Sequence, residues 1–276
     1  MSFAPLRLQV RRVMTLGVMC VAVGLAGCQT TRTGSGSPEV TGSISRPAAA
    51  QPVASLPAVG EGSARNVAAQ ARVWEQDPSN VQAAMSYAAN LRAIGQHEKA
   101  IEVLGETARR NPSDAVILGV YGKELAKAGM SDQASVALKQ AMNTGRADWS
   151  VYSAQGAVLD QMGRHAEARS HYEEALRRGG ERGKVLNNMG LSYALEGNLA
   201  QAEQVLKAAV AEPANAHNTQ LRQNLALVMG LKGDYEGARQ IAGRDLPSNV
   251  VEGNMNVLKT IAQGGGQRTV GSANAG

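Results

Sequence analysis

One pattern recurs five times along the chain and limits what it can fold into: a glycine followed, five residues later, by an alanine. Successive glycines are separated by 34, 34, 34 and 36 residues, a period typical of a supersecondary unit that stacks on copies of itself. Glycine ends a helix at a positive φ without steric penalty, and alanine lets two helices cross closely. The pattern therefore predicts an all-α solenoid of antiparallel helix pairs. The glycines are Gly95, Gly129, Gly163, Gly197 and Gly233, and the alanines are Ala100, Ala134, Ala168, Ala202 and Ala238.

The composition agrees with a helical fold. Of the 276 residues 43% are apolar, but only one is Phe and two are Trp, so the core must consist of Ala, Leu and Val. Long alternating runs of Val, Ile and Thr are absent, which argues against an all-β sandwich or a parallel α/β sheet. The two cysteines, Cys20 and Cys28, lie near the N-terminus, so the rest of the chain can hold neither a disulfide framework nor a cysteine zinc site.

The repeated unit resembles the tetratricopeptide repeat. The family has a small residue seven positions before each turn glycine, and this chain has one there in all five units. The family prefers an apolar residue directly before that small residue, and only Gln155 in the third unit departs from this preference. Thr107 and Asp245 depart from the small residue that the family has near the end of the second helix. The small residues are Ala88, Gly122, Gly156, Gly190 and Ala226. The resemblance implies repeats at about 81–114, 115–148, 149–182, 183–216 and 219–252, with a leading helix at 66–76 and a covering terminal helix at 249–262.

The N-terminus carries the features of an export signal. Arg7, Arg11 and Arg12 precede an uncharged, weakly apolar stretch that is too short to span a membrane. The stretch ends in Leu-Ala-Gly-Cys at 25–28, which matches the lipobox of bacterial lipoproteins. The match implies cleavage before Cys28, lipidation of Cys28 and, because Gln follows it, a lipid anchor at the periplasmic face of the outer membrane. An ordinary secretory signal in which Cys28 is incidental is the alternative.

Composition divides the chain into four parts. Residues 1–27 are the signal peptide, and 28–63 are the lipidated cysteine and a disordered tether whose Gly, Ser, Thr, Ala and Pro cannot offset the entropy of ordering. Residues 64–262 form the repeat domain, and 263–276 form a flexible tail. Loss of the signal peptide lowers Lys and Arg from 28 to 25, against 23 acidic residues. The mature chain is therefore nearly neutral, and we expect no nucleic-acid partner.

The sequence offers no convergent set of catalytic or metal-binding residues. His97 and His165 each lie two residues after a turn glycine, where we expect a solvated surface; His171 is off the helical face of His165, and His217 lies in a connection. Residues 179–184 end like a phosphate-binding loop but lack its first glycine and its final Ser or Thr, so an inter-repeat turn is the better interpretation. We expect no enzyme activity, no metal and no cofactor.

The concave face is the predicted site of protein binding. In tetratricopeptide solenoids the first helix of each pair lines this face, at the second, fifth, sixth, ninth and twelfth positions of the unit. In the fourth and fifth units these positions combine amides with leucines, which suits an extended peptide. Polar positions without a dedicated ligand are the alternative, and Met85 and Ala89 replace the lysine and asparagine with which some such domains clamp a C-terminal carboxylate. The predicted peptide-binding residues are Lys184, Asn187, Asn188, Leu191, Gln220, Gln223, Asn224 and Leu227.

A longer run of residues narrows the resemblance. The sequence from Arg222 to Gly233, continued by Ala238 and Arg239 and by Arg-Asp-Leu at 244–246, is similar to the last repeat of TadD-type lipoproteins of the Tad (Flp) pilus assembly system. That resemblance implies an outer-membrane lipoprotein that serves as a pilotin or assembly factor for the secretin, or binds another pilus assembly component. The alternative is a tetratricopeptide lipoprotein that regulates a peptidoglycan synthase or another envelope complex.

Overall fold

The computed structural model describes the backbone of residues 59–270 and the side chains of residues 66–262. The predicted signal peptide, Cys28 with its lipobox, the tether up to residue 58 and the last residues of the tail, 271–276, lie outside the described residues.

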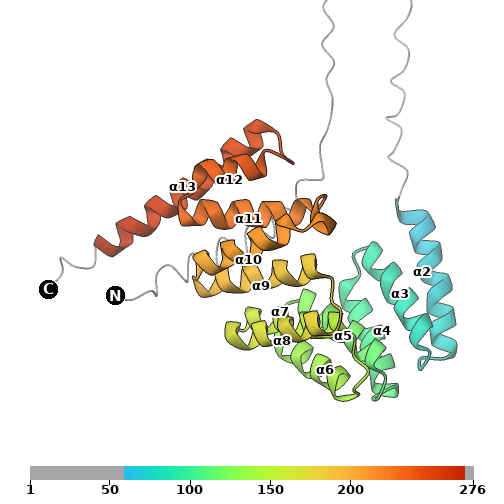
Figure 1. The fold of residues 1–276 in the computed structure, drawn as a ribbon. Coiled ribbons are helices and arrows are strands. Elements are labelled where there is room, and N and C mark those ends of the chain that lie inside the picture. The colour runs from blue at the N-terminus through green and yellow to red at the C-terminus, as the bar shows by residue number, and fades with distance from the viewer. Residues whose placement is uncertain (1–58, 271–276) are drawn as a thin grey trace, which may run out of the picture.

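Helices and turns make up the described part of the chain, which confirms the predicted all-α fold (Figure 1). Five helix pairs follow one another, and each begins within one residue of its predicted start. The pairs are α3 (Val81–Ala93) with α4 (His97–Arg110), α5 (Ala115–Lys127) with α6 (Ser131–Asn143), α7 (Trp149–Gln161) with α8 (His165–Arg177), α9 (Arg182–Glu196) with α10 (Leu199–Ala211), and α11 (Thr219–Lys232) with α12 (Tyr235–Ala242). A short 3-10 helix, η1 (Pro213–Asn215), connects the last two pairs.

Two further helices extend the array, and both run past the predicted domain boundaries. The leading helix α2 (Val59–Gln76) begins before residue 64, and the terminal helix α13 (Ser248–Val270) continues beyond residue 262. Elongating a helix that already exists adds one hydrogen bond for each residue that is fixed, so a helix can extend into a Gly-containing segment that composition alone assigns to a tether or a tail.

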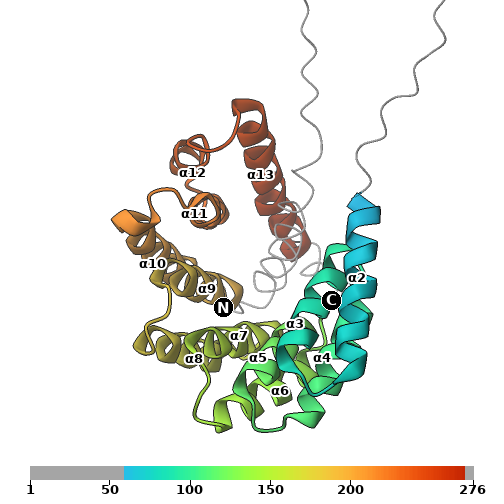
Figure 2. The same cartoon turned by 90° about the vertical axis from the view of Figure 1, so that its right-hand side faces the viewer.

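The helix pairs follow a curve. Figure 2 shows α5, α7, α9 and α11 on its inner side and α6, α8, α10 and α12 on its outer side. Each first helix packs on its own second helix and on the first helix of the next pair, and α13 packs on α11 as well as on α12. We call the concave surface that these first helices form the inner face.

The turn glycines adopt the predicted conformation. The five glycines of the repeat pattern have φ between 76° and 99°, the left-handed region in which a side chain is strained. Gly145 and Gly179 share this conformation, with φ of 73° and 78°, and lie between one pair and the next. Gly179 therefore lies in an inter-repeat turn, as the sequence predicts for 179–184, whereas the matching role of Gly145 is visible only in the structure.

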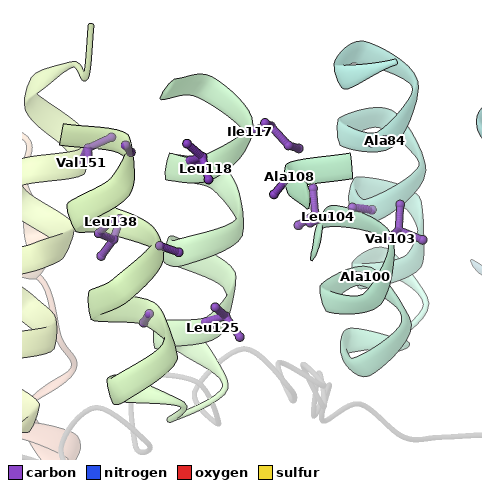
Figure 3. Close-up of a cluster of buried hydrophobic side chains, with 14 of the residues drawn as sticks. Ala84, Ala100, Val103, Leu104, Ala108, Ile117, Leu118, Leu125, Leu138 and Val151 are labelled. Carbon is purple, nitrogen blue, oxygen red and sulfur yellow. The ribbon is translucent and has the colours of Figure 1, made fainter. Parts of the chain in front are cut away.

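Small residues on the first helix make room for large side chains of the second. A Cβ atom on Gly122 would lie 2.7 Å from Leu138 Cγ, and one on Gly156 would lie 2.6 Å from Tyr172 Cε1. The five alanines that follow the turn glycines are fully buried. Figure 3 shows the core of the first units, where apolar side chains including Leu138 lie between the helices.

Thr107 departs from the repeat pattern because it joins the leading helix to the first pair. Its hydroxyl accepts a hydrogen bond from Trp74 Nε1 at 2.9 Å and donates one to the Pro78 carbonyl at 2.9 Å. Thr107 is fully buried. A smaller, apolar residue at this position would leave the Trp74 indole N–H without its partner.

Candidate partner-binding surface

Side chains of successive first helices meet along the inner face. Lys123 of α5 donates a hydrogen bond from Nζ to Ser150 Oγ of α7 at 3.0 Å. Asn188 of α9 donates from Nδ2 to Ser153 Oγ of α7 at 3.3 Å. These contacts place second, fifth, sixth and ninth positions of the units at the seams between first helices.

Two amides of the predicted site pair with each other. Asn224 Nδ2 on α11 donates to Asn187 Oδ1 on α9 at 2.7 Å, and Asn187 is only 8% exposed. Among the described residues, Asn187 Nδ2 and Asn224 Oδ1 make no further hydrogen bond. The pair therefore presents one donor and one acceptor, which are the groups that the backbone of an extended peptide requires.

The remaining polar residues of the predicted site are not part of this amide pair. Gln223 donates from Nε2 to Asp245 Oδ2 at 3.3 Å and turns toward the end of α12. Lys184 is exposed and pairs with Glu181 at 2.8 Å, and Gln220 is exposed near the start of α11. The structure thus brings together Asn187 and Asn224, whereas Asn188 bonds to Ser153 on α7 and the rest of the predicted set lies apart from the pair.

Leucines lie beside the amides on the same two helices. Leu191 and Leu227 are half-buried and pack against the C-terminal core, as do Leu195 and Leu231 one turn later. The sequence analysis overlooked the second two, although their spacing of four residues in both helices is the signal of a shared helical face. Together they give the inner face an apolar row next to its amides.

A largely buried ion pair fixes the end of the fifth unit. Arg222 Nε donates to Asp245 Oδ2 at 2.8 Å, and Thr219 Oγ1 donates to Asp245 Oδ1 at 3.1 Å. The hydrogen bonds from Arg222 hold the pKa of Asp245 below its ordinary value. Asp245 lies beyond α12, which ends at Ala242, so its departure from the repeat pattern reflects a shortened second helix.

The prediction that His165 is a surface residue is wrong. His165 is 8% exposed, and its Nδ1 lies 2.8 Å from Asp160 Oδ1. Ser192 and Tyr172 donate hydroxyl hydrogen bonds to the same carboxylate at 2.7 and 2.9 Å. Burial raises the pKa of Asp160, and these hydrogen bonds oppose that rise. The cluster ties α7, α8 and α9 together, because the buried carboxylate draws the imidazole inward from its turn.

The other histidines lie apart. His97 and His217 are exposed, whereas His171 is half-buried beside Tyr152, and its burial lowers its pKa. Within residues 66–262 no group of three His, Cys, Asp or Glu side chains is arranged to hold a metal ion. In the same part of the chain, no helix combines the length and the apolarity that crossing a membrane would need.

The sequence and the fold both match known proteins. Residues 150–178, which span α7 and α8, match the sequence profile described as "Tetratricopeptide repeat". No curated protein matches the chain. Among solved structures, similarity is found to PilW, a widely conserved type IV pilus biogenesis factor, with 15% identity over 67% of this chain and 85% of that one and a TM-score of 0.59.

Two further solved structures have the same architecture. TTC0263, a thermophilic TPR protein in Thermus thermophilus, is 19% identical over 66% of this chain and 100% of that one, with a TM-score of 0.54. YrrB, a TPR protein with an unusual peptide-binding site, is 17% identical over 70% of this chain and 99% of that one, with a TM-score of 0.50. At these identities the similarity shows the fold, a solenoid of tetratricopeptide repeats suited to protein binding.

Proposed function

We propose that this chain is an outer-membrane-anchored scaffold that binds a secretin segment and acts as a pilotin or assembly factor in a Tad (Flp) pilus system. The solenoid supplies a protein-binding surface. The lipobox at 25–28 supports lipid anchoring through Cys28, and the resemblance of residues 222–246 to TadD-type lipoproteins supports a role in pilus assembly.

The observation that carries the proposal is the contact between Arg222 and Asp245. The two residues stand at opposite ends of the segment that resembles TadD-type lipoproteins, and their side chains are 2.8 Å apart. Gln223, in the same segment, donates to the same carboxylate. The resemblance therefore covers residues that fold into one unit around α11, which is a helix of the inner face.

The inner face of α9 and α11 suits a peptide in an extended conformation. The Asn187–Asn224 pair offers one donor and one acceptor to the peptide backbone, and the neighbouring leucines offer apolar contact to its side chains. In the proposal, residues 29–58, the part of the predicted tether that precedes α2, span the distance between the membrane and the start of the array. A flexible linker of that length has a root-mean-square reach of roughly 30 Å.

The test is a titration of the mature chain, kept free of lipid by Cys28→Ser, with the periplasmic C-terminal segment of the secretin from the same pilus system. Replacing Asn188 and Asn224 together by Ala removes the hydrogen bonds that, in the proposal, these two amides make to the bound peptide. Each such bond is worth about 0.5 to 1.5 kcal/mol. Binding should therefore weaken about five- to a hundredfold if the two losses add. Circular dichroism checks folding, which Ala should preserve as the better helix former.

Gln140→Ala provides a matched control. Gln140 is an exposed amide on α6, and its Nε2 donates to the Pro112 carbonyl at 3.0 Å. It lies on an outer helix, so its loss should leave secretin binding unchanged. Equal affinity for the parent and the double variant would exclude these amides from the site, and absence of binding by the parent would exclude the secretin segment as partner.

A further inference from the structure

The apolar core is not continuous along the array. One cluster of 18 buried residues runs from Ala84 on α3 to Val158 on α7, and another of 14 runs from Ala194 on α9 to Leu258 on α13. Between them lies a cluster of only six buried residues, contributed by α7, α8 and α9. We call α2–α8 the N-terminal block, α9–α13 the C-terminal block, and the contact of α9 with α7 and α8 the middle seam. The two blocks are thus joined by less apolar packing than holds each of them together.

Polar groups fill part of the middle seam. Ser192 of α9 donates to Asp160 of α7 at 2.7 Å, and both side chains are buried. Burying a carboxylate has a desolvation cost that hydrogen bonds only partly offset. The equivalent positions of the two neighbouring seams are occupied by alanine and valine, Ala126 with Val158 and Ala194 with Val228. The middle seam therefore has a buried charge where its neighbours have apolar residues.

The first seam, between α3 and α5, also has an ion pair at these positions. Arg92 donates to Glu124 at 2.8 Å, but the Arg92 side chain is one-third exposed, at 33%. The N-terminal apolar cluster continues across this seam, from Leu91 on α3 and Leu104 on α4 to Ile117 on α5. A polar pair alone therefore does not divide the core, and the division is particular to the middle seam.

A side chain at the middle seam leaves a buried hydrogen-bonding atom without a partner. Arg169 of α8 lies over the ring of Tyr193 of α9, with Cζ 4.3 Å from the ring centroid, and pairs with Glu196 at 3.0 Å. Its Nη1 is buried and makes no hydrogen bond to any described residue. Such a donor keeps the full cost of losing water. The closed seam thus contains a contact that is only partly satisfied.

The connection that crosses the middle seam is weakly constrained. The other four first helices begin after an Asn or Asp whose side chain accepts a hydrogen bond from the first turn, at Asn80, Asp114, Asp148 and Asn218. Glu181 stands at this position before α9 and makes no such bond. Two adjacent glycines, Gly179 and Gly180, precede it, and glycine has more accessible backbone conformations than any other residue. Backbone rotation at 179–181 is therefore opposed by fewer contacts than in the other connections.

The amides of the inner face divide between the blocks. Asn187 and Asn224 both belong to the C-terminal block, so their hydrogen bond does not cross the middle seam. The hydrogen bond from Asn188 to Ser153 does cross it and is long, at 3.3 Å. A rotation at the seam would therefore move the Asn187–Asn224 pair as a unit and break the contact of Asn188.

We propose that the middle seam is a hinge, at which the C-terminal block turns as a body against the N-terminal block and changes the curvature of the inner face. The hydrogen bond from Ser192 to Asp160 holds the closed orientation, and residues 179–181 absorb the backbone rotation. The proposal goes beyond the function proposed above and does not depend on the identity of the partner.

Distances between paramagnetic labels on introduced cysteines test the hinge. Residues 28–276 with Cys28→Ser contain no other cysteine, so each label has one possible site. Val136→Cys with Gln204→Cys spans the middle seam and the seam before it, whereas the matched pair Glu102→Cys with Ser170→Cys spans the first two seams. All four positions are exposed, and they are equivalent positions of α6, α10, α4 and α8. The first pair should show a broader distribution of distances than the second.

Two substitutions should change the first distribution in opposite directions. Ser192→Ala removes the contact that holds the seam closed and should broaden it further. Glu181→Asp provides the cap that the other first helices have and should narrow it. Neither substitution should change the distribution of the Glu102→Cys and Ser170→Cys pair, and circular dichroism checks that every variant is folded.

Equal widths for the two label pairs in the parent chain would overturn the proposal. It would equally be overturned if Ser192→Ala broadened both distributions alike, because the whole array would then loosen rather than one seam. An unchanged first distribution in both Ser192→Ala and Glu181→Asp would show that neither the contact nor the connection controls the orientation of the blocks. The secretin titration is independent of each of these outcomes.

Discussion

At the residue scale, glycine has two separate roles in this chain. Gly95 and Gly129 end first helices at positive φ, and a Cβ atom there would meet no other group within 4 Å. Gly156 lies inside a helix, and a Cβ atom there would lie 2.6 Å from the ring of Tyr172. The first role is conformational and the second is steric, so substitutions at the two kinds of site act through different mechanisms.

The steric role predicts opposite effects of one substitution at two helical glycines. Gly156→Ala should lower stability by about 1–3 kcal/mol, because Tyr172 is held by its hydrogen bond to Asp160 and cannot move aside. Gly253→Ala, where nothing lies within 4 Å, should raise it by up to about 1 kcal/mol through helix propensity. Denaturant midpoints measure both. A stabilising Gly156→Ala would contradict the packing described here.

Some residue-scale features could not be predicted from the period. The offset of His165 from its turn glycine places it on a helix but not toward Asp160, which lies in the preceding helix. Gln155 was recognised as a polar residue at an apolar position, yet its hydrogen bond to Ser135 at 3.0 Å depends on the packing of α6 against α7. Polar contacts between helices depend on rotamers and packing, which a repeat pattern does not specify.

At the element scale, the fifth unit differs from the others because its second helix has only eight residues. The chain after α12 turns back so that Asp245 meets Arg222 and Thr219 on α11. Side-chain contacts thus replace the last turn of a normal second helix. The chain can then begin α13 at Ser248.

This arrangement predicts a pH-dependent contribution to stability. The pKa of Asp245 is lower in the folded chain than its ordinary value of 3.8, so the stabilisation is fully present above about pH 5 and is lost as the pH falls from there through the lowered pKa. Asp245→Asn should cost about 1.5 kcal/mol at neutral pH through weaker hydrogen bonds to Arg222. The difference between parent and variant should shrink by pH 3.

Thermal unfolding of both chains across this pH range provides the measurement. Glu236→Gln is the control, because Glu236 pairs with Arg239 with 88% of its side chain exposed, and a pair in solvent contributes little. If the difference in stability between the parent and Asp245→Asn stays constant down to pH 3, the variant does not act through the charge of this carboxylate.

The period predicts the helix pairs well because the residues that define a unit are close in sequence. The starts of α3, α5 and α7 follow directly from glycine, alanine and their spacing. The two amide contacts follow the same register: Asn188 and Asn224 are the sixth residues of their units, and they donate to Ser153 and Asn187, the fifth residues of the preceding units. The two residues that the 36-residue spacing adds fall in the connection that contains η1, so the fifth unit keeps this contact with the fourth.

At the scale of the whole molecule, the proposed attachment and the proposed binding surface lie at opposite ends of the array. Cys28 precedes α2, whereas the amides of the proposed binding surface lie on α9 and α11. The helices between them pack on their neighbours along the chain. In the proposal, the solenoid therefore adds its own length to the reach of residues 29–58 in setting the separation between membrane and partner.

Attachment predicts a change of location for one substitution. Cys28→Ser should leave an unlipidated chain that is uncleaved or released from the outer membrane, because the thioether that carries the lipid can no longer form. Radiolabelled palmitate and membrane fractionation measure this. Incorporation of palmitate by the variant would show that another residue carries the lipid, and release of the parent chain would show that it has no anchor.

The packing of each helix on its neighbours has a mechanical consequence. If the lipid end and a bound partner are pulled apart, the load passes in series through each seam that lies between α2 and the helices holding the partner. The force that the array withstands is then set by its weakest seam rather than by the average strength of its seams. The Trp74–Thr107 and Asp160–Ser192 contacts each cross such a seam, so their loss would lower the force that the chain transmits even where binding itself is unchanged.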